Sequence, residues 1–548
     1  MDAVAWLCWL ATCMTSWTLG FVAKEPLYGI STGVSYTMAV TVGGTGSSRR
    51  PSTLQLLLDT GSSNMAVATS ACCTNSQALG PLAVFNCAAS PTCASTTQPA
   101  TNISVKYIAA SWMGHVVQDT VSTTHLGAVP EFPFVAIDVQ QEFFKGGYNG
   151  ILGVAFDALA QPRDNPMTTL VQTLVDRRQM ENVFGVLMCG ILQPFARGLR
   201  PSNVSGAMVF GGVAPPTGPA LYRGPVVYTP LIQPKWYVVL VTEVAFNGTS
   251  LPLPCTAFNA PKAIVDSGTT NIVLPPPVYR PLMAMLRDAT LQAIPDFPST
   301  YFSDRSVCCE AYCDPTNVNS TLMSLPSLSF SFALMGQVND QVTVTIPPTY
   351  YWRPIAVQSA VGTTMCRMIG LSEGSSTILG NVFMDGLYTV HDRRNGQIGL
   401  AVADNCDNLA ISTKTISTSA MPSSTASWCD CLSNAELNDN LVTSKLPGQR
   451  ACFIWYWWTY VFVVSIIVIA VCCAILLWMW LAKRRRNNYI REAPGPPPSF
   501  LQHQLLDAEG LMTPKEPPPI SPCSESRSPS FAGLSMSSTA PHVNEHIF

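Results

Sequence analysis

Two short segments of the chain have nearly the same sequence, and this repetition constrains the fold more than any other feature. Residues 57–64 read LLDTGSSN and residues 264–271 read IVDSGTTN. In each segment an apolar, strand-like run precedes Asp, a hydroxyl residue and Gly, and the segment closes on Asn. One Asp-Thr/Ser-Gly tripeptide is usually an ordinary turn, because Asp and Gly favour turns. Two matching copies predict a duplicated architecture that brings Asp59 and Asp266 together.

The residue types in these segments suit a reaction catalysed by two carboxyl groups. Hydrolysis of a peptide bond without a metal or a covalent nucleophile needs one group that activates water and one that protonates the carbonyl oxygen. Two carboxyl groups that share a proton can do both. We therefore expect Asp59 and Asp266 to be catalytic, with no metal and no organic cofactor. Six neighbours are expected to support them through amides and hydroxyl groups: Thr60, Gly61, Ser62, Ser267, Gly268 and Thr269.

A second repeated element follows each motif. It is an apolar run with a closing Gly, at residues 149–153 and again at residues 376–381. With both elements in place, the segment from Tyr36 to Cys406 resembles the pepsin-like aspartic peptidases. The resemblance implies a mostly β, two-lobed fold and endopeptidase activity on peptide or protein substrates.

Within that family the chain is most similar to the membrane-anchored β-secretase branch. The narrower resemblance rests on residues 64–67, 221–237 and 334–336, and on a hydrophobic segment near the C-terminus. One position departs from the branch. β-Secretases carry an Arg in the substrate groove where this chain has Val273, which implies weaker selection for acidic substrate side chains.

The resemblance also implies a flap over the substrate. Residues 105–112 have the pattern of a hairpin, and Tyr107 and Trp112 have the spacing of the flap tyrosine and its supporting tryptophan. The alternative is two ordinary strand aromatics, since aromatic residues favour strands. Ala110 stands where the family has Gly at the flap tip, a change that could stiffen the flap.

Cysteines are numerous, and a secretory context favours disulfides over metal binding. Between residues 69 and 100, two loop disulfides are expected among Cys72, Cys73, Cys87 and Cys93. In the second half the resemblance implies three pairs: Cys189–Cys406, Cys255 with Cys429 or Cys431, and Cys308–Cys366. Two alternatives stay open, that Cys309 or Cys313 substitutes in the third pair, and that these two pair with each other.

The N-terminal region predicts export. Residues 1–20 have the apolar core and small residues of a signal peptide, although Asp2 replaces the usual basic residue. We interpret residues 21–35 as a short N-terminal or pro segment, followed by a first lobe over 36–215 and a second lobe over 216–410. A net charge of −3 gives no sign of nucleic acid binding.

The C-terminal region predicts a membrane anchor. Residues 411–452 are rich in Ser and Thr and are interpreted as a stalk. Residues 453–481 are apolar throughout and long enough to span a bilayer. The basic run at 483–486 places the segment after the apolar run, residues 482–548, in the cytosol. This Pro- and Ser-rich tail is expected to be disordered.

The combined interpretation is a single-pass type I membrane endopeptidase of the Golgi, endosome, lysosome or cell surface. Its expected substrates are peptides or proteins, including other single-pass membrane proteins, and no oligomeric state is predicted. Glycosylation sequons in the lumenal part fit this topology, at Asn102, Asn203, Asn247 and Asn319. Two alternatives are a generalist endolysosomal acid peptidase and a catalytically inactive binding receptor on the same fold.

Overall fold

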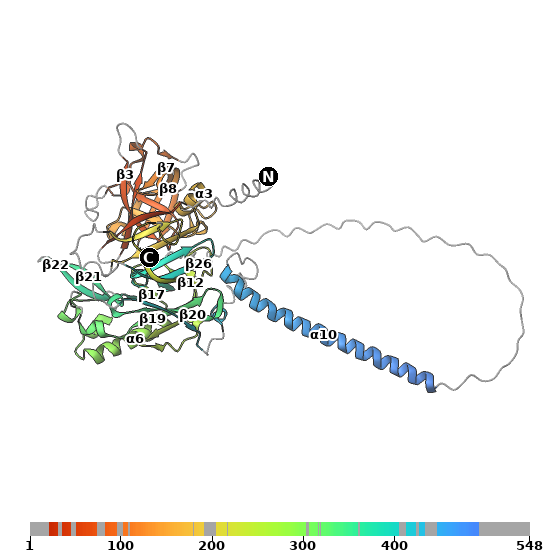
Figure 1. The fold of residues 1–548 in the computed structure, drawn as a ribbon. Coiled ribbons are helices and arrows are strands. Elements are labelled where there is room, and N and C mark those ends of the chain that lie inside the picture. Colours follow the sequence, from red (N-terminus) through yellow and green to blue (C-terminus); the bar gives the residue numbers. More distant parts are fainter. Residues whose placement is uncertain are drawn as a thin grey trace, which may run out of the picture. The chain divides into compact units, whose positions relative to one another are not determined.

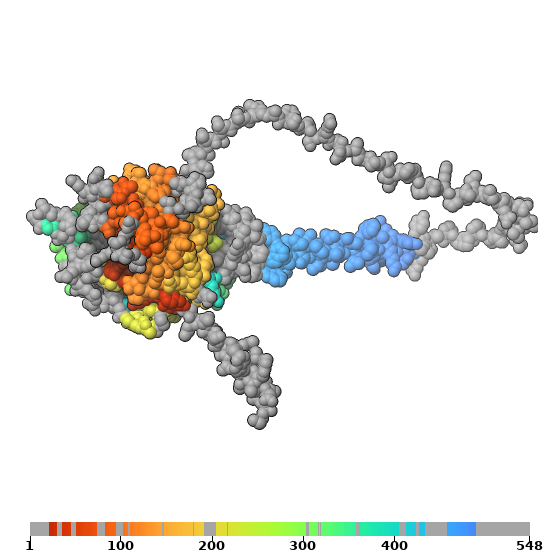
Figure 2. Space-filling model, turned by 90° about the horizontal axis from the view of Figure 1, so that it is seen from above, coloured from red at the N-terminus to blue at the C-terminus, as the bar shows by residue number. Residues whose placement is uncertain are grey.

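The computed structural model has two β-rich lobes followed by a long apolar helix (Figure 1). The division of the chain into compact units falls at Tyr456/Trp457, and each unit is described by itself. Figure 2 shows first-lobe residues, coloured red to light orange, over much of the face seen from above. The structure describes residues 21–30, 35–44, 51–73, 83–95, 102–107, 110–178, 180–190, 204–215, 217–302, 306–315, 317, 319–359, 362–404, 413–422, 427–432 and 447–492.

One large sheet runs through the first lobe and joins it to the second. Strands β12, β25 and β26 come from the second lobe, so both lobes contribute to the joining part. The order is β12 (Tyr222–Pro230), β26 (Gln397–Ala403), β25 (Leu387–Asp392), β10 (Val183–Met188), β11 (Val204–Phe210), β1 (Ala23–Ile30), β2 (Ser35–Val42), β3 (Ser52–Asp59), β9 (Gly150–Gly153), β4 (Met65–Ala68), β8 (Gly127–Gln141), β7 (Ser111–Thr123) and β5 (Ala94–Ser95), with β6 (Asn102–Lys106) beside β7.

The second lobe contains smaller sheets. One is ordered β13 (Val238–Val239), β16 (Ala263–Val265), β24 (Thr377–Leu379), β17 (Ile272–Leu274) and β23 (Leu371–Glu373). Another is ordered β15 (Thr249–Ser250), β14 (Val241–Phe246), β19 (Leu328–Leu334), β20 (Gln337–Ile346) and β27 (Thr415–Ala420). A third is ordered β18 (Val307–Cys308), β22 (Gly362–Ile369) and β21 (Trp352–Ser359).

Most helices of the lobes are short, and α6 (Pro276–Ala293) is the exception. It begins with prolines, which tolerate the first helical turn. Its buried Val278, Leu282 and Leu286 recur every four residues and so face the core. In the described residues the other helices of the lobes are α2 (Ser70–Cys73), η1 (Cys87–Ala89), η2 (Phe143–Gly146), η3 (Asp157–Leu159), α3 (Leu170–Arg178), α5 (Cys255–Phe258), η4 (Ser299–Phe302), η5 (Ala311–Cys313), η6 (Thr321–Ser324), α7 (Pro348–Tyr351), α8 (Asn381–Met384) and η7 (Trp428–Cys431). Helix α10 (Pro447–Glu492) follows them in the chain.

Most of the segment interpreted as a short N-terminal or pro segment, residues 21–35, lies within the joining sheet. Strand β1 lies between β11 and β2 in the joining sheet, with Leu27 opposite Met38 and Gly206. Ala23, Glu25 and Leu27 alternate into buried positions, as expected for a strand in the middle of a sheet. Removing this segment would therefore take an interior strand from the fold.

Part of the segment interpreted as a stalk, residues 411–452, packs as part of the second lobe. Strand β27 pairs with β20 over the whole of its length, and the Trp428 side chain in η7 is 1% exposed. The Trp428 indole donates a hydrogen bond to the Gln337 carbonyl at 2.9 Å. Strand β27 is mostly exposed and made of Ser, Thr, Ile and Ala, so it gives no hydrophobic signal in the sequence. The second lobe thus continues to at least Leu432.

In the second unit, α10 contains the apolar segment expected from the sequence. Residues Trp457–Asn488 form a helix that is long and apolar enough to cross a membrane. Near the end of this segment the Arg484 guanidinium lies 5.2 Å from the Trp480 ring centre. This pairing of an aromatic and a basic residue is typical of a membrane interface.

Candidate active site

In the first lobe, β3 ends at Asp59. The strand pairs in parallel with β9, the first copy of the second repeated element, so that Leu58 lies beside Leu152. Both strands are buried where they meet the motif, and this rigid support fixes the loop that follows. In that loop the Gly61 amide donates to Asp59 Oδ1 at 2.7 Å, and the Ser62 hydroxyl donates to Asp59 Oδ2.

The second lobe repeats this arrangement. Strand β16 pairs in parallel with β24, the second copy of the repeated element, and the Asp266 amide donates to the Leu379 carbonyl at 3.1 Å. The Gly268 amide donates to Asp266 Oδ1 at 2.9 Å, and the Thr269 hydroxyl donates to Asp266 Oδ2 at 2.7 Å. Each carboxyl group is therefore oriented by one amide and one hydroxyl of its own loop.

Hydroxyl groups join the two loops to each other. The Thr60 hydroxyl donates to the Val265 carbonyl at 3.0 Å, and the Ser267 hydroxyl donates to the Leu58 carbonyl at 2.7 Å. Both side chains are fully buried. Buried hydrogen bonds between the lobes restrict the relative movement of the loops, which preorganises the two carboxyl groups.

The two glycines of the motifs are required by close packing. A Cβ atom at Gly61 would lie 2.6 Å from Asp266 Oδ1, and one at Gly268 would lie 2.4 Å from Asp59 Oδ1. Each loop therefore passes directly against the carboxyl group of the other lobe. No side chain larger than hydrogen fits without displacing an aspartate.

The two carboxyl groups form a buried, hydrogen-bonded pair. Asp59 is 3% exposed and Asp266 is fully buried. Burial and then the charge of Asp266 raise the pKa of Asp59 well above its usual value, and the hydrogen bond to Asp266 raises it further. Burial also raises the pKa of Asp266, while the hydrogen bond from Asp59 opposes that shift. The pair therefore retains one shared proton at acidic pH, and its apparent pKa values belong to both groups.

The predicted flap residues lie beside the first motif. Tyr107 follows β6, and Trp112 on β7 pairs with Val105 across the hairpin. The Trp112 indole donates to the Tyr107 hydroxyl at 3.1 Å, and both residues line one small cavity together with Ser62. Burial raises the pKa of Tyr107 well above its usual value, and the nearby Asp59 charge raises it further. At the hairpin end, the Tyr107 amide donates to the Ala110 carbonyl at 2.7 Å.

The aromatic residues that support the flap were not expected from the sequence. The Phe143 ring stacks on Tyr107, with ring centres 5.7 Å apart and an angle of 13° between the planes. The same ring meets Trp112 and Tyr148 edge-on. Burial, and then the charge of Asp59, raises the pKa of Tyr148. The concentration of aromatic residues at 143–148 was the available signal.

Asn271, which closes the second motif, is held from two sides. Its amide nitrogen donates to Ser372 Oγ at 2.8 Å, and its Oδ1 accepts from Arg353 Nε at 3.0 Å. Arg353 is 6% exposed, and burial lowers its pKa to about 10. Val273 is buried on β17 and packs closely against Gly374. A Cβ atom added to Gly374 would lie 2.3 Å from Val273 Cγ1.

The disulfides agree in part with expectation. Cys72 pairs with Cys73, Cys87 pairs with Cys93, and Cys255 takes Cys431 rather than Cys429. The predicted Cys189–Cys406 pair includes Cys406, which lies outside the described residues; Cys189 itself is disulfide-bonded.

The prediction of a Cys308–Cys366 pair is wrong. Cys309 bonds to Cys366 and Cys308 bonds to Cys313, which also removes the alternative Cys309–Cys313 pair. The reason is register. Cys308 lies opposite Arg367 in the antiparallel β18–β22 pair, so the next residue, Cys309, meets Cys366. Cys308, Glu310 and Cys313 are close together, but both sulfur atoms belong to the disulfide and so offer no thiolate to a metal.

Three of the four sequons lie on the described surface. Asn102, Asn247 and Asn319 are exposed, and Asn247 occupies the turn between β14 and β15 with φ +54°. Asn203 lies outside the described residues.

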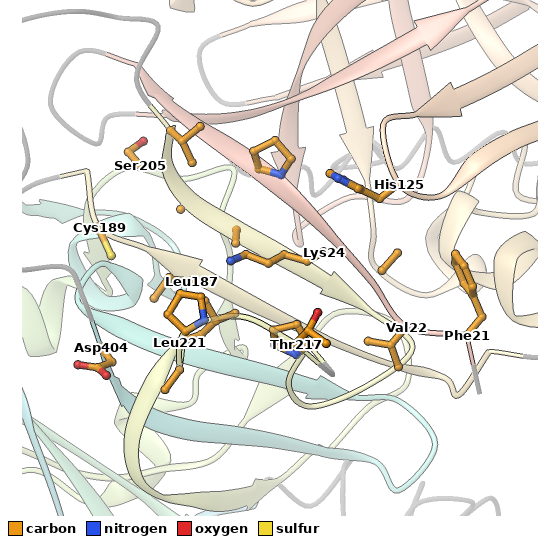
Figure 3. Close-up of a pocket in the computed structure, with 18 residues that line it drawn as sticks. Phe21, Val22, Lys24, His125, Leu187, Cys189, Ser205, Thr217, Leu221 and Asp404 are labelled. Carbon is orange, nitrogen blue, oxygen red and sulfur yellow. The ribbon is translucent and has the colours of Figure 1, made fainter. Parts of the chain in front are cut away.

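A larger cavity of about 680 Å³ lies away from the motifs, against β1, β10 and β11 (Figure 3). Neither aspartate lines it. Lys24, His125 and Asp404 contribute its charged or titratable side chains, and most of the remaining lining is apolar.

Two mirrored Asp-hydroxyl-Gly loops, joined across a two-lobed β fold, define an aspartic protease. The chain belongs to the eukaryotic aspartyl protease family, which it matches over residues 35–403. It is similar to a β-secretase of Strongylocentrotus purpuratus, with 27% identity over 379 residues that cover 67% of this chain and 66% of the relative. It is also similar to a gastricsin of Suncus murinus, with 26% identity over 70% of this chain and 84% of the relative. A gastricsin of Homo sapiens is likewise 26% identical, over 64% of this chain and 79% of that protein.

Proposed function

We propose that this chain is a membrane-anchored aspartic endopeptidase that hydrolyses peptide bonds in membrane-proximal proteins. The observation that carries the proposal is the buried, hydrogen-bonded pair of Asp59 and Asp266 with its mirrored donors. An inactive receptor on the same fold would have no need for two intact carboxyl groups buried against each other, because each buried carboxyl group destabilises the fold at neutral pH.

In the proposed reaction the pair carries one proton and one negative charge. The ionised carboxylate accepts a proton from a water molecule as the water oxygen attacks the substrate carbonyl carbon. The protonated carboxyl group donates its proton to the carbonyl oxygen. A tetrahedral diol forms and then collapses as a proton passes to the leaving amine. The amides of Gly61 and Gly268 keep both carboxyl groups in place throughout.

Tyr107 is the proposed flap residue. Trp112 donates to its hydroxyl oxygen, which fixes the orientation of the Tyr107 hydroxyl group beside the first motif loop. Phe143 holds the Tyr107 ring by stacking, so the side chain is positioned before substrate binds. An extended substrate can then hydrogen-bond in β fashion between the flap and the motif loops.

An apolar helix that is long enough to anchor the chain in a membrane supports the proposed substrate class. The segment Trp457–Asn488 would place the lobes at a membrane surface, with the basic residues from Lys483 to Arg486 on the cytosolic side. Tethering raises the effective concentration of substrates attached to the same membrane. We therefore propose single-pass proteins of the Golgi, endosome, lysosome or cell surface as substrates.

A peptide library tests the activity. Purified protein ending at residue 446 is incubated with the library at acidic pH, with and without pepstatin, beside the Asp59→Asn variant. We expect cleavage that both pepstatin and the variant abolish. A defined cleavage motif would support a selective protease, and broad cleavage would favour the generalist peptidase. Absence of cleavage by folded wild-type protein would leave only the receptor.

A further inference from the structure

Lys414 is a buried cation at the C-terminal end of α8. The side chain is 1% exposed, and its Nζ donates to the carbonyl oxygens of Val382 at 2.8 Å, Phe383 at 2.7 Å and Asp385 at 2.5 Å. Nζ also lies 4.1 Å from the centre of the Tyr350 ring. The last carbonyl groups of a helix have no hydrogen-bond partner within the helix, and here one ammonium group donates to three carbonyl oxygens at that end.

The other end of α8 rests on the second catalytic loop. The Asn381 amide donates to the Thr269 carbonyl at 2.8 Å, and the Val382 amide donates to the Thr270 carbonyl at 2.9 Å. A Cβ atom at Gly380 would lie 2.5 Å from the Thr269 carbonyl oxygen, so the helix and the loop are in direct contact. A displacement of α8 would therefore move the loop.

The same loop orients a catalytic carboxyl group, because the Thr269 hydroxyl donates to Asp266 Oδ2. The turn after α8 is fixed from the first lobe, where the Tyr36 hydroxyl donates to Asp385 Oδ2 and accepts from the Gly190 amide. We propose that Lys414 is a positioning residue for the reaction, whose ammonium group fixes α8 and thereby the loop that carries Asp266. The inference rests on the proposed peptidase function.

The charge state of Lys414 fits this role. Burial lowers its pKa to about 7, and the Asp385 charge opposes the shift. The titratable groups that face it are Asp385 and, beyond it, Tyr36, whose pKa burial raises well above the usual value; Tyr350 contributes its ring. At acidic pH the ammonium has three N–H donors for the three carbonyls, whereas a neutral amine has two.

Variants of Lys414 test the inference against a matched control. Lys414→Met removes the charge and every donor, Lys414→Gln keeps two donors without charge, and Lys414→Arg keeps the charge. The control is Arg367→Met. Arg367 on β22 is another buried cation, 2% exposed, and it donates to the backbone carbonyl of Trp352. Thermal unfolding of all four variants measures the loss of stability and the fraction of each protein that is folded. Activities are then compared at equal folded fraction.

We expect Lys414→Met to lower kcat by about tenfold or more with KM changed less than about threefold, since small displacements of catalytic groups reduce the rate strongly. Lys414→Gln should fall between this variant and the wild type, and Lys414→Arg should recover most of kcat. Arg367→Met should keep kcat although it is destabilised. If the Lys414→Met protein does not fold, Lys414→Gln and Lys414→Arg carry the comparison. Equal kcat losses in the Lys414 variants and in Arg367→Met, or no recovery with Arg, would overturn the inference.

Hydrogen exchange separates failure of this inference from failure of the proposed function. In the Lys414→Gln protein we expect faster amide exchange in residues 266–272 and 379–386 than in wild type, and unchanged exchange there in Arg367→Met. This result does not require catalysis, so it holds even if the wild type cleaves no peptide. Unchanged exchange in both segments would refute the positioning role whether or not the protein is a peptidase.

Discussion

The Thr60 amide donates a hydrogen bond to Ser267 Oγ at 3.0 Å, and the Ser267 amide returns one to Thr60 Oγ1 at 2.9 Å. These two residues come from different lobes and occupy equivalent positions in the two motifs. Each hydroxyl also donates onward to the other lobe, so neither has an unsatisfied proton. The exchange links the two motif loops directly to each other at the lobe interface.

This exchange predicts that Thr60 and Ser267 act together. Thr60→Val and Ser267→Ala should each destabilise the protein by about 1–3 kcal/mol, because a buried donor or acceptor is left unpaired. The double variant should lose less than the sum of the single losses, since either change alone breaks the exchange. Denaturant unfolding of the four proteins measures the coupling. Strict additivity would mean that the two hydroxyl groups stabilise the loops independently.

The shared proton predicts an acidic, bell-shaped activity profile. Activity falls when low pH protonates both carboxyl groups and when rising pH removes the shared proton. Asp59→Asn and Asp266→Asn should each abolish hydrolysis without unfolding the lobes. Steady-state rates from pH 3 to 8, with circular dichroism at each pH, check this. A constant rate through neutral pH in folded protein would exclude the shared proton as the controlling group.

Asp59 also predicts a stability change with pH. Its folded pKa is raised, so the folded protein binds more protons than the unfolded chain above the ordinary Asp pKa of about 3.9. Stability therefore decreases as pH rises above that value. Asp59→Asn should lose this dependence and gain stability relative to wild type between pH 4 and pH 7. Urea unfolding at both pH values compares them, and equal pH dependence in the two proteins would argue against a raised pKa.

His391 predicts the opposite pH dependence. It is fully buried, stacks on Phe184 with ring centres 4.6 Å apart, and has a pKa lowered to about 3 by burial and then by the Arg393 charge. Between pH 6.5 and 3 only the unfolded chain protonates this residue, so acid favours unfolding. Between pH 7 and pH 4.5, the His391→Phe protein should lose about 2–3 kcal/mol less stability than the wild type. Unfolding of both proteins at these two pH values tests it; identical losses would contradict a neutral His391.

Val273 predicts a substrate preference unlike that of typical β-secretases. No cation occupies this position, so selection for acidic substrate side chains should be weak. Val273 is buried against Gly374, so an Arg at this position has to extend its guanidinium away from β17 to reach a substrate. Val273→Arg should then raise kcat/KM for peptides with an acidic residue by about tenfold relative to neutral peptides. Paired peptides that differ by Asp and Asn measure the ratio, with Val273→Gln as an uncharged control of similar length. A strong acidic preference in wild type, unaffected by the substitution, would show that another group selects the substrate.

The two motifs could be interpreted from the sequence because their chemistry is local. A carboxyl group, the amide two residues later and the hydroxyl three residues later lie in one tight loop, so the support of Asp59 by Gly61 and Ser62 follows from residue types and spacing. The mostly β, two-lobed fold was implied by the resemblance to the pepsin-like aspartic peptidases, which those loops carry. The apolar segment near the C-terminus likewise needs only length and composition.

Only the tertiary structure decided what lies next to these loops. Strand β27 has no hydrophobic pattern, because it pairs at the edge of a sheet and is held by backbone hydrogen bonds that any sequence can make. Cys309 rather than Cys308 reaches Cys366 because strand register, and not cysteine spacing, sets which side chains meet. In the sequence, Lys414 is an ordinary polar residue before a Ser/Thr-rich run. It is a buried cation only because the fold places its side chain against the carbonyl groups of α8. Such contacts join residues far apart in the chain, and their energies depend on burial that the linear sequence does not contain.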